Sequence, residues 1–474
     1  MARRDQEKAN MPVDTETGSN TSGDGSTKDD SSPPAYRNDD TRTASSVAQE
    51  DGAEIDLTPL SWWKAGTILF AETVSLGILS LPSVIANVGI APGIALIVIM
   101  AILSGYSGLI FGEFCMQYPE IESFGDVGDV VGRAVGGPAV GVAFREFLGW
   151  GQTIFQIFVM GSHLLTWTIA MNTLTDRSHQ CTVMWAGVGL VVFWLFNLPR
   201  NLNIASYLSV ASSLSIFSAV IVTVVDVGIE KPIGSTSLDV ANQLGFTGAF
   251  LSVTNIAIAF CSHSCFFNVI SELNIKTDWP KALIMLQSLD TALYIVAAVV
   301  IYVYVGPDVP SPALSAAGSE VVRKVIWGIA LPTIVIAGVI YGHVATRYIF
   351  GRILGKTRHM HKRTLIGDAG WVCVGLSIWI IAFVIAESIP VFNSLLSLIC
   401  ALFVSWFSYG VPGIMWLFLY RGQYYKNWKM MAGLVSNILL VVVGFMLCVL
   451  GLWSTIDSLA SDSKQTPWSC ASNA

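Results

Sequence analysis

A carboxylate, two hydroxyls and a glycine interrupt an otherwise apolar stretch, LFAETVSLGILSLPSVIANVG, at residues 69–89. The polar positions are Glu72, Thr73, Ser75 and Gly77. A charged side chain within a membrane helix faces a polar cavity or a partner, because lipid does not solvate it. We therefore expect Glu72 to bind and release a proton in coupled transport. The alternative is that Glu72 is hydrogen-bonded to a neighbouring helix and holds that helix in place.

The same stretch predicts a break in its helix at residues 74–78. Gly77 relaxes the backbone dihedral limits, and Pro82 removes a donor from the following turn. A break inside a membrane is tolerated only beside a polar cavity. Its exposed N–H groups suit a carboxylate, and its exposed C=O groups suit an ammonium or a cation, so an α-amino acid matches both. The alternative is that Gly and Ser only allow close helix packing.

A second polar interruption, CSHS at residues 261–264, lies within the apolar segment SVTNIAIAFCSHSCFFNVISEL. Paired interruptions at corresponding positions of two halves point to the binding site of a transporter. The third predicted helix could add one face to this site. The predicted substrate-binding residues are Thr73, Val74, Ser75, Leu76, Gly77, Ile78, Gln156, Met160, Phe260, Cys261, Ser262, His263 and Ser264.

Three other ionisable residues fall at membrane depth. His163 and His343 could relay protons, because histidine titrates near neutral pH; the alternative is that each is simply a buried hydrogen-bonding group. For Asp290 we expect a capping or structural role.

The elements that must position these residues follow from composition. The chain has 474 residues, of which 53% are hydrophobic and 12% are charged; a soluble protein carries about a quarter charged residues. Runs of about 20 apolar residues recur, and each can cross the membrane as a helix. The predicted helical segments are 62–87, 92–117, 145–172, 181–198, 203–228, 246–272, 280–305, 321–351, 368–388, 391–419 and 431–454. The polar, glycine-rich region 120–140 predicts a re-entrant or surface element.

Charge separates the chain into three parts. Residues 1–60 hold 13 acidic and 6 basic side chains, and the remainder holds 20 of each sign. Residues 1–57 are poor in aromatic residues, and we expect them to be a disordered cytoplasmic tail. A transmembrane domain at 58–455 and a short extracytoplasmic tail at 456–474 would follow.

Lysine and arginine set the expected orientation. With the N-terminus in the cytoplasm, the inward connections and helix ends hold fifteen basic residues against five on the outward side. An odd number of crossings then places the C-terminus outside. Cys181 and Cys470 would share the oxidising side, where they could pair or remain two free thiols. The absence of a CxxC pair argues against a zinc or iron–sulfur site.

Two motifs resemble those of a known family. AETVSLGILSLPSVIANVG, followed by GEFCMQYPE, is similar to the amino acid/auxin permease family of the wider amino acid–polyamine–organocation superfamily, and particularly to its fungal neutral amino acid permeases. IAFCSHSCFFNVISEL lies where this family has its second break, and His263 aligns with the histidine of that motif. The likeness covers about residues 58–455.

The resemblance implies an all-α membrane protein with a leucine-transporter-like fold of five plus five inverted helices and one extra helix. It also implies amino acid uptake driven by protons or sodium. In sodium-driven relatives of the fold, groups of the first and eighth helices hold the ion, so Val74, Gly77 and Thr333 form a candidate ion site.

We therefore expect a secondary active transporter of neutral amino acids, with protons favoured over sodium as the coupling ion. The alternative is a transporter-like sensor that signals through its N-terminal tail. No paired catalytic carboxylates, HExxH motif, nucleophile elbow or phosphate-binding loop indicates an enzyme. We expect an amino acid and the lipid bilayer as partners, no nucleic acid, no other cofactor and a monomer. We favour the plasma membrane over the vacuolar membrane.

Overall fold

The computed structural model describes residues 60–175, 181–200, 205–232, 238–355, 357–361, 364–461 and 466–473, apart from the side chains of 205–207 and 361. The predicted tail at 1–57 lies outside these residues. The described chain is helical almost throughout, and an isolated parallel bridge between Leu60 and Leu273 is its one β-type pairing.

Nine described helices are long and apolar enough to cross a membrane, and a bent pair adds a tenth span. The nine are α3 (Ile90–Gln117), α5 (Pro138–Leu174), α7 (Ala205–Glu230), the pair α8 (Phe246–Ala259) and α9 (His263–Glu272), α10 (Trp279–Val305), α11 (Glu320–Leu354), α13 (Leu365–Ser388), the continuous run α14 (Phe392–Ile399), η5 (Cys400–Gly410) and α15 (Val411–Leu419), and α16 (Trp428–Ser461).

The bent pair is α1 (Trp62–Thr73) with the 3₁₀ turn η2 (Gly77–Leu79) and α2 (Leu81–Val88). A further apolar helix, α6 (Thr182–Phe196), has 15 residues, fewer than the ~20 that span a bilayer in a straight helix. Each of the eleven segments expected from the sequence thus contains a helix or a helix pair. The predicted class, an all-α polytopic membrane protein, is confirmed.

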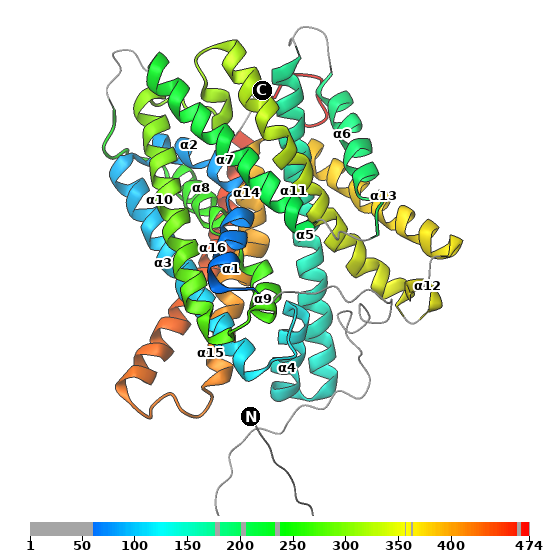
Figure 1. Cartoon of the computed structure of the whole chain (residues 1–474). Coiled ribbons are helices and arrows are strands. Elements are labelled where there is room, and N and C mark those ends of the chain that lie inside the picture. Colours follow the sequence, from blue (N-terminus) through cyan, green and yellow to red (C-terminus); the bar gives the residue numbers. More distant parts are fainter. Residues whose placement is uncertain are drawn as a thin grey trace, which may run out of the picture. The chain divides into compact units, whose positions relative to one another are not determined.

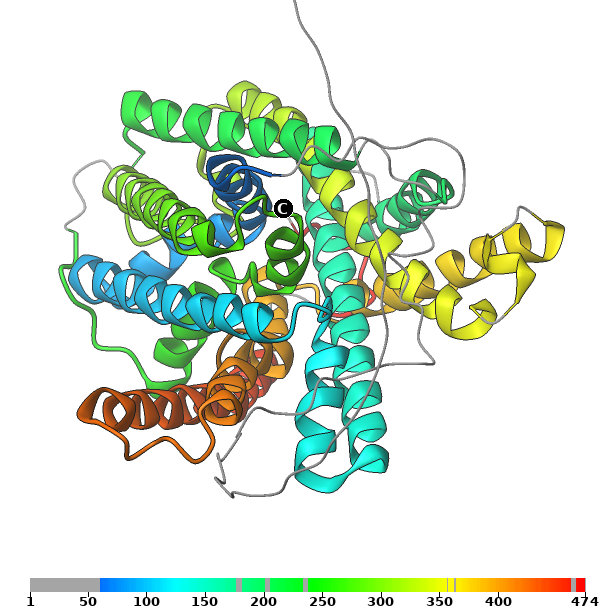
Figure 2. The same cartoon turned by 60° about the horizontal axis from the view of Figure 1, so that its bottom comes forward.

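The region 120–140, where we expect a re-entrant or surface element, holds a short helix in front of α5 and no separate membrane span among the described residues. It forms α4 (Phe124–Gly136), and α5 begins at Pro138, earlier than the predicted residue 145. α4 lies along the first turns of α5 as a helical hairpin (Figure 2). The glycines make this close packing possible: a Cβ on Gly128 would lie 2.6 Å from the Phe144 carbonyl oxygen. The buried Asp129 carboxylate binds Arg145 at 2.8 Å across the hairpin.

The helices form two packed groups (Figure 1). In one group α10 lies against α1, α2 and α3, while α8 contacts α2 and α9 contacts α3. In the other group α5, α6, α11 and α13 pack against one another, and α7 contacts helices of both groups. Side chains on the outward faces are large and apolar, as lipid requires; Ile102 of α3 and Ile284 of α10 are 64% and 65% exposed.

The two interrupted spans run side by side in opposite directions (Figure 1). At one end, the Leu60 N–H donates to the Glu272 carbonyl at 2.9 Å, so the chain entering α1 meets the chain leaving α9. At the other end, the Asn242 N–H donates to the Val88 carbonyl at 3.1 Å, so the end of α2 meets the segment before α8. This antiparallel arrangement brings the middles of both spans together.

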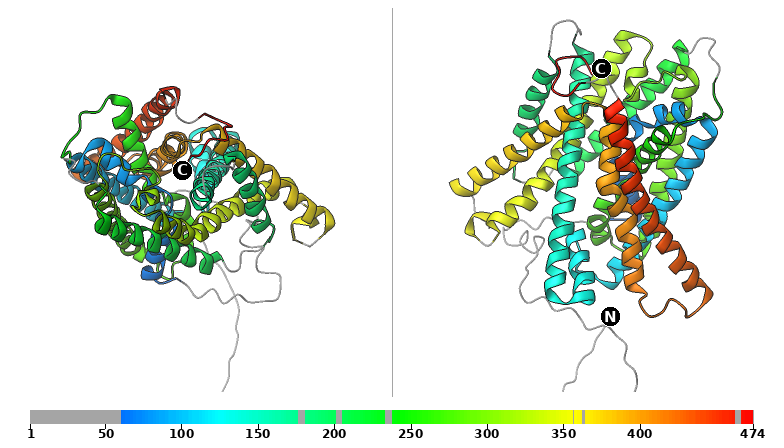
Figure 3. Two further views of the ribbon diagram at one scale, coloured as in Figure 1. Left: turned by 90° about the horizontal axis from the view of Figure 1, so that it is seen from above. Right: turned by 180° about the vertical axis from the view of Figure 1, so that it is seen from behind.

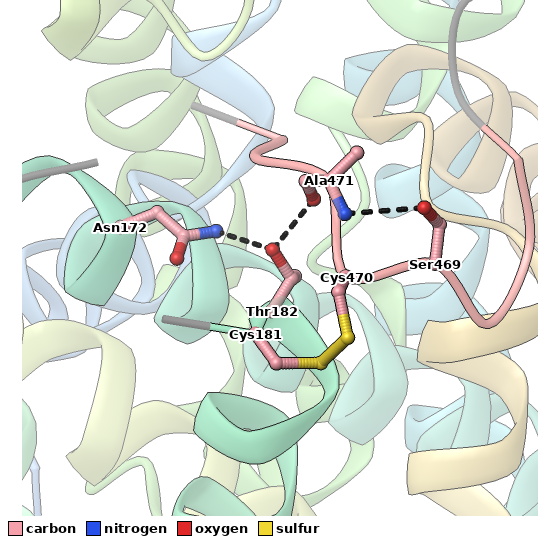
Figure 4. The surroundings of a disulfide bond; sticks show 6 residues. All are labelled: Asn172, Cys181, Thr182, Ser469, Cys470 and Ala471. Atoms are coloured by element: carbon pink, nitrogen blue, oxygen red, sulfur yellow. Dashed lines mark hydrogen bonds between the residues drawn. A yellow bond between two sulfur atoms is a disulfide. The ribbon is translucent and has the colours of Figure 1, made fainter. Parts of the chain in front are cut away.

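The segment after α16 is bound to the ends of α5 and α6. Cys470 forms a disulfide with Cys181, which precedes α6 (Figure 4). The Thr182 hydroxyl donates to the Ala471 carbonyl at 2.6 Å, and the Asn172 amide donates to the Thr182 hydroxyl at 2.8 Å. The C-terminal residues therefore lie against the ends of α5 and α6, as both views in Figure 3 show.

We predict that Cys470→Ser destabilises the protein by about 2–4 kcal/mol, because a disulfide between residues far apart in sequence restricts the unfolded chain. Thermal unfolding in detergent, followed by intrinsic tryptophan fluorescence, measures the change. Cys373→Ser is the matched control, since Cys373 is an exposed free cysteine. Equal melting temperatures for the Cys470 variant and the parent would contradict the prediction.

Candidate functional site

Both interruptions expected from the sequence are present. α1 ends at Thr73, residues 74–76 are not helical, and the two halves of the span meet at a bend of 50°. α8 ends at Ala259 and α9 begins at His263, so three residues separate them. Helix interruptions of this kind occur at membrane depth only where protein or a water-filled cavity replaces the lost hydrogen bonds.

Gly77 allows the two breaks to touch. A Cβ built on Gly77 would lie 2.6 Å from the Ala259 Cα, which is closer than a side chain can approach backbone. Any other residue here would push the first break away from the second. Within the described part of the chain, the N–H groups of Leu76 and Gly77 make no hydrogen bond. These N–H groups therefore remain free for a ligand.

A tyrosine of α10 holds the ends of both broken helices. The Tyr294 hydroxyl lies 2.8 Å from the Ala259 carbonyl oxygen and 3.2 Å from the Thr73 carbonyl oxygen. It can donate its one proton to either carbonyl, so it bridges the last turns of α8 and α1. The Phe260 ring packs edge-on against Tyr294 with centroids 5.2 Å apart. Phe260 is thus part of the wall that surrounds this bridge.

Residues of α3 satisfy the second break. The Ser104 hydroxyl donates to the Phe260 carbonyl at 3.2 Å. The fully buried His263 lies with its Nε2 2.7 Å from the Ser107 hydroxyl, among the rings of Phe111 and Phe266. His263 therefore fastens the start of α9 to α3.

A small pocket opens beside the first break, between α1, α7 and α11. Its lining residues are Ala71, Glu72, Val74, Ser75, Ser209, Ser212, Ala337, Ile340 and Tyr341. Glu72 is the one charged residue in this lining, and its carboxylate makes no hydrogen bond with any residue that the structure describes. Among the described residues there is thus no hydrogen bond from Glu72 to a neighbouring helix of the kind that its alternative, structural role would require.

Each break also carries a hydroxyl with no partner. The buried Ser75 and Ser262 hydroxyls form no hydrogen bond within the described residues. Unpaired polar groups are uncommon in protein interiors and call for a ligand, a water or an ion. The two breaks together thus offer hydroxyl and N–H groups that the fold itself leaves unused.

The other residues predicted to bind substrate are distributed around the breaks. Thr73 returns its hydroxyl to the Leu69 carbonyl at 2.7 Å, and Cys261 accepts a weak hydrogen bond from Ser408 at 3.7 Å. The remaining members make no contact that assigns them to the pocket beside Glu72. They are Leu76 and Ile78, which are buried, Ser264, which is half-buried, and Gln156 and Met160, which are buried on α5.

The predicted coupling histidines occupy different places. His163 of α5 is buried against α11, with its ring 6.1 Å from that of Tyr341, which lines the pocket. His343 instead packs against Trp371 of α13 at 5.0 Å. Only His163 is brought beside the pocket.

The candidate ion site at Val74, Gly77 and Thr333 is divided by the structure. Val74 lines the pocket, whereas Gly77 is the residue that contacts Ala259 of α8. The Thr333 hydroxyl donates to the Ser212 carbonyl. A cation in the pocket would therefore meet Val74 together with residues of α7.

Asp290, for which we expect a capping or structural role, makes no capping hydrogen bond to the described residues. It lies on α10, is fully buried, and neither carboxylate oxygen has a hydrogen-bond partner among the described residues. Sequence reasoning also missed Tyr294, one turn further on, and Ser104. The spacing of Asp290 and Tyr294 by four residues in an apolar helix places both on one face, and that spacing was the available signal.

Two unwound segments that meet in the middle of antiparallel spans are a pattern found at the substrate sites of transporters. Comparison with known proteins agrees. A family model described as "Transmembrane amino acid transporter protein" matches residues 58–457. The chain belongs to this family, as its sequence resemblance indicated; it is a membrane amino acid transporter and not an enzyme.

Similar proteins include fungal transporters. The chain is 30% identical to the "N amino acid transport system protein" of Neurospora crassa, over 87% of this chain and 88% of that protein. It is 28% identical to a "Transmembrane transporter" of Gibberella moniliformis, over 86% of each. Among solved structures, the nucleobase-cation-symport-1 family transporter Mhp1 matches with a TM-score of 0.50 at 12% identity, over 87% of this chain and 96% of Mhp1. This likeness shows the predicted leucine-transporter-like fold.

We predict that Gly77→Val weakens amino acid binding at least tenfold, because the new side chain would separate the first break from Ala259. Binding of a labelled substrate to purified protein measures the effect. Gly328→Val on α11 is the control, since a Cβ there would meet nothing within 4 Å. Parental affinity in the Gly77 variant would remove the first break from the site.

We predict that Tyr294→Phe destabilises the protein by about 1–3 kcal/mol, because it removes the hydroxyl donor from the buried Ala259 carbonyl, whereas the Thr73 carbonyl still accepts the Ser75 N–H at 2.9 Å. Melting temperature in detergent is the measurement, with Tyr304→Phe as the control on the same helix. An unchanged melting temperature would show that the bridge does not hold the two breaks.

Proposed function

We propose that this protein is a secondary active transporter of neutral amino acids that couples uptake to protons. One observation carries the proposal: two touching helix breaks leave N–H and hydroxyl groups unused beside a pocket that contains a lone carboxylate. The family and the fold support amino acid transport; the substrate class and the coupling ion are the new steps.

The α-carboxylate and α-ammonium groups of the substrate fit the first break. The free N–H groups of Leu76 and Gly77 lie at the start of a half-helix, where the helix dipole favours an anion. The Thr73 carbonyl, at the end of the other half, favours a cation. A zwitterion carries both charges within the length of one unwound segment.

A neutral side chain fits the remaining surface. The pocket lining contains no lysine or arginine to pair with an acidic substrate, and Glu72 would repel one. A cationic side chain would pair with Glu72 and prevent it from exchanging its proton. The second break adds the apolar Phe260 ring, so uncharged substrates meet the least penalty.

Glu72 is the proposed proton-coupling residue. It lines a pocket between α1 of one helix group, α11 of the other group and α7, which contacts both, so relative motion of the groups would change its access to water. The described part of α7 contains no lysine or arginine whose positive charge could take the place of a bound coupling ion. His163, beside Tyr341, is placed to relay a proton. Sodium, bound by Val74 and the α7 residues, is the alternative.

Transport by alternating access follows from the two helix groups, which would rock about the breaks. We further propose that the N-terminus is cytoplasmic, that the C-terminus is outside, and that the protein acts as a monomer in the plasma membrane. The excess of basic residues on the inward connections supports this orientation.

Reconstituted vesicles test the proposal. Uptake of labelled neutral, acidic and basic amino acids would be compared under separate proton and sodium gradients. We expect accumulation of neutral amino acids with an inward proton gradient. Accumulation driven by sodium alone, or preference for charged amino acids, would refute the corresponding part of the proposal.

We predict that Glu72→Gln abolishes proton-driven accumulation while part of the exchange of internal for external substrate remains, because glutamine is uncharged at every pH. Uptake is measured from pH 5 to pH 8 in the same vesicles. Glu113→Gln is the control, since Glu113 contacts Tyr420, the residue after α15, away from the pocket. The same pH profile in the Glu72 variant and the parent would refute the coupling role.

A further inference from the structure

Asp290 is a second carboxylate that the proposed site does not use. It lies about 16 Å from the start of α10 and about 22 Å from its end, at 1.5 Å per residue, which is near mid-span. The residue is fully buried, and neither oxygen has a hydrogen-bond partner among the described residues. An ionised carboxylate without a partner is costly at such a place, so Asp290 carries a proton in this conformation.

No lysine, arginine or histidine that the structure describes forms an ion pair with Asp290. The elements around it are α10 itself, the neighbours α1, α2, α3, α7, η2, the 3₁₀ turns η3 (Lys276–Asp278) and η4 (Ala313–Ala316), and the breaks at α8 and α9. α2, α8, η2 and η4 contain no ionisable residue. Among the side chains that the structure describes, the other elements and the break between α8 and α9 carry Lys64, Glu72, Tyr106, Glu113, Cys115, Asp226, Glu230, Cys261, His263, Cys265, Glu272, Lys276, Asp278, Lys281, Tyr294, Tyr302 and Tyr304. Tyr294 shares α10 with Asp290 and lies four residues further along it.

The position of Tyr294 links the protonation of Asp290 to the hydrogen bonds at the two helix breaks. Side chains four residues apart are neighbours on a helix, so the Tyr294 side chain begins one turn from Asp290. That hydroxyl bridges the Thr73 and Ala259 carbonyls at the two breaks. A carboxylate accepts a hydrogen bond about twice as strong as a neutral carbonyl does. Loss of the Asp290 proton would therefore draw the hydroxyl away from the breaks.

We propose that Asp290 is a proton-binding site of the transport cycle that controls the Tyr294 bridge. With the proton on Asp290, Tyr294 holds α1 against α8 and the substrate site is assembled. When α1 moves away from α10 and water enters, Asp290 releases its proton to water and accepts the Tyr294 hydroxyl, and the breaks separate. Reprotonation returns the hydroxyl to the carbonyls. This inference rests on the proposed proton-coupled transport and adds a second proton to it.

Substrate affinity measured against pH tests the inference in purified full-length protein. Each proton linked to binding weakens affinity tenfold per pH unit above its transition. We expect Asp290→Asn, which cannot ionise, to bind substrate and to reduce the slope of log Kd against pH by one relative to the parent. Asp226→Asn is the matched control, because the Asp226 carboxylate is buried but accepts the Gly318 N–H at 2.9 Å; its slope should equal that of the parent.

Two further measurements keep the outcome decisive if Asp290→Asn folds poorly. The infrared C=O band of a protonated carboxyl group should be present at neutral pH in the parent and in Tyr294→Phe, and reduced in Asp290→Asn. Tyr294→Phe should lose the same unit of slope while keeping the band. Unchanged slope in both variants, or an unchanged band in Asp290→Asn, would overturn the inference and leave the proposed transport intact. If neither the substrate affinity nor the uptake of the parent protein depends on pH, proton coupling itself is overturned, and this inference with it.

Discussion

Peptide groups without partners in a water-poor interior constrain this structure more than any other factor. Each such group costs several kcal/mol in the membrane, so a helix can open there only if other side chains replace its lost hydrogen bonds. Tyr294 provides this for the last turns of α1 and α8, and Ser104 provides it for the Phe260 carbonyl. The groups that remain unpaired are then the ones that a substrate can satisfy.

The residues that support the helix breaks come from different helices than the residues that close the pocket beside Glu72. Tyr294 and Ser104 belong to α10 and α3, which pack with the broken spans in one helix group. The pocket beside Glu72 is instead closed by α7 and by α11, a helix of the other group. Rocking of one group against the other would therefore change the wall of the pocket without breaking these hydrogen bonds, whereas a separate movement of α1 away from α10 would break the Tyr294 bridge. This is the arrangement that a moving site needs.

The sequence allowed both breaks to be predicted, because Gly77, Pro82 and the CSHS segment disturb helices by local effects. It also allowed the all-helical class, because lipid-facing runs are long and apolar. Local sequence could not reveal Tyr294 or Ser104 as partners, since their roles depend on tertiary contacts. The glycines at 120–140 were misleading for a related reason. Glycine is unfavourable in an isolated helix, but α4 uses Gly128 to lie against α5, and that benefit exists only in the packed structure.

The charges of the interior favour protons as the ions of this transporter. Glu72 and Asp290 lie near mid-span, and neither forms an ion pair within the described residues. Two unpaired carboxylates can be buried together only if their charge is removed, and a proton does so without needing the several oxygen ligands that a metal cation requires. Glu72 lies between the helix groups, whereas Asp290 lies within one group. A motion that opens the pocket and a motion that lifts α1 would thus expose the two carboxylates at different steps, so their protons need not move together.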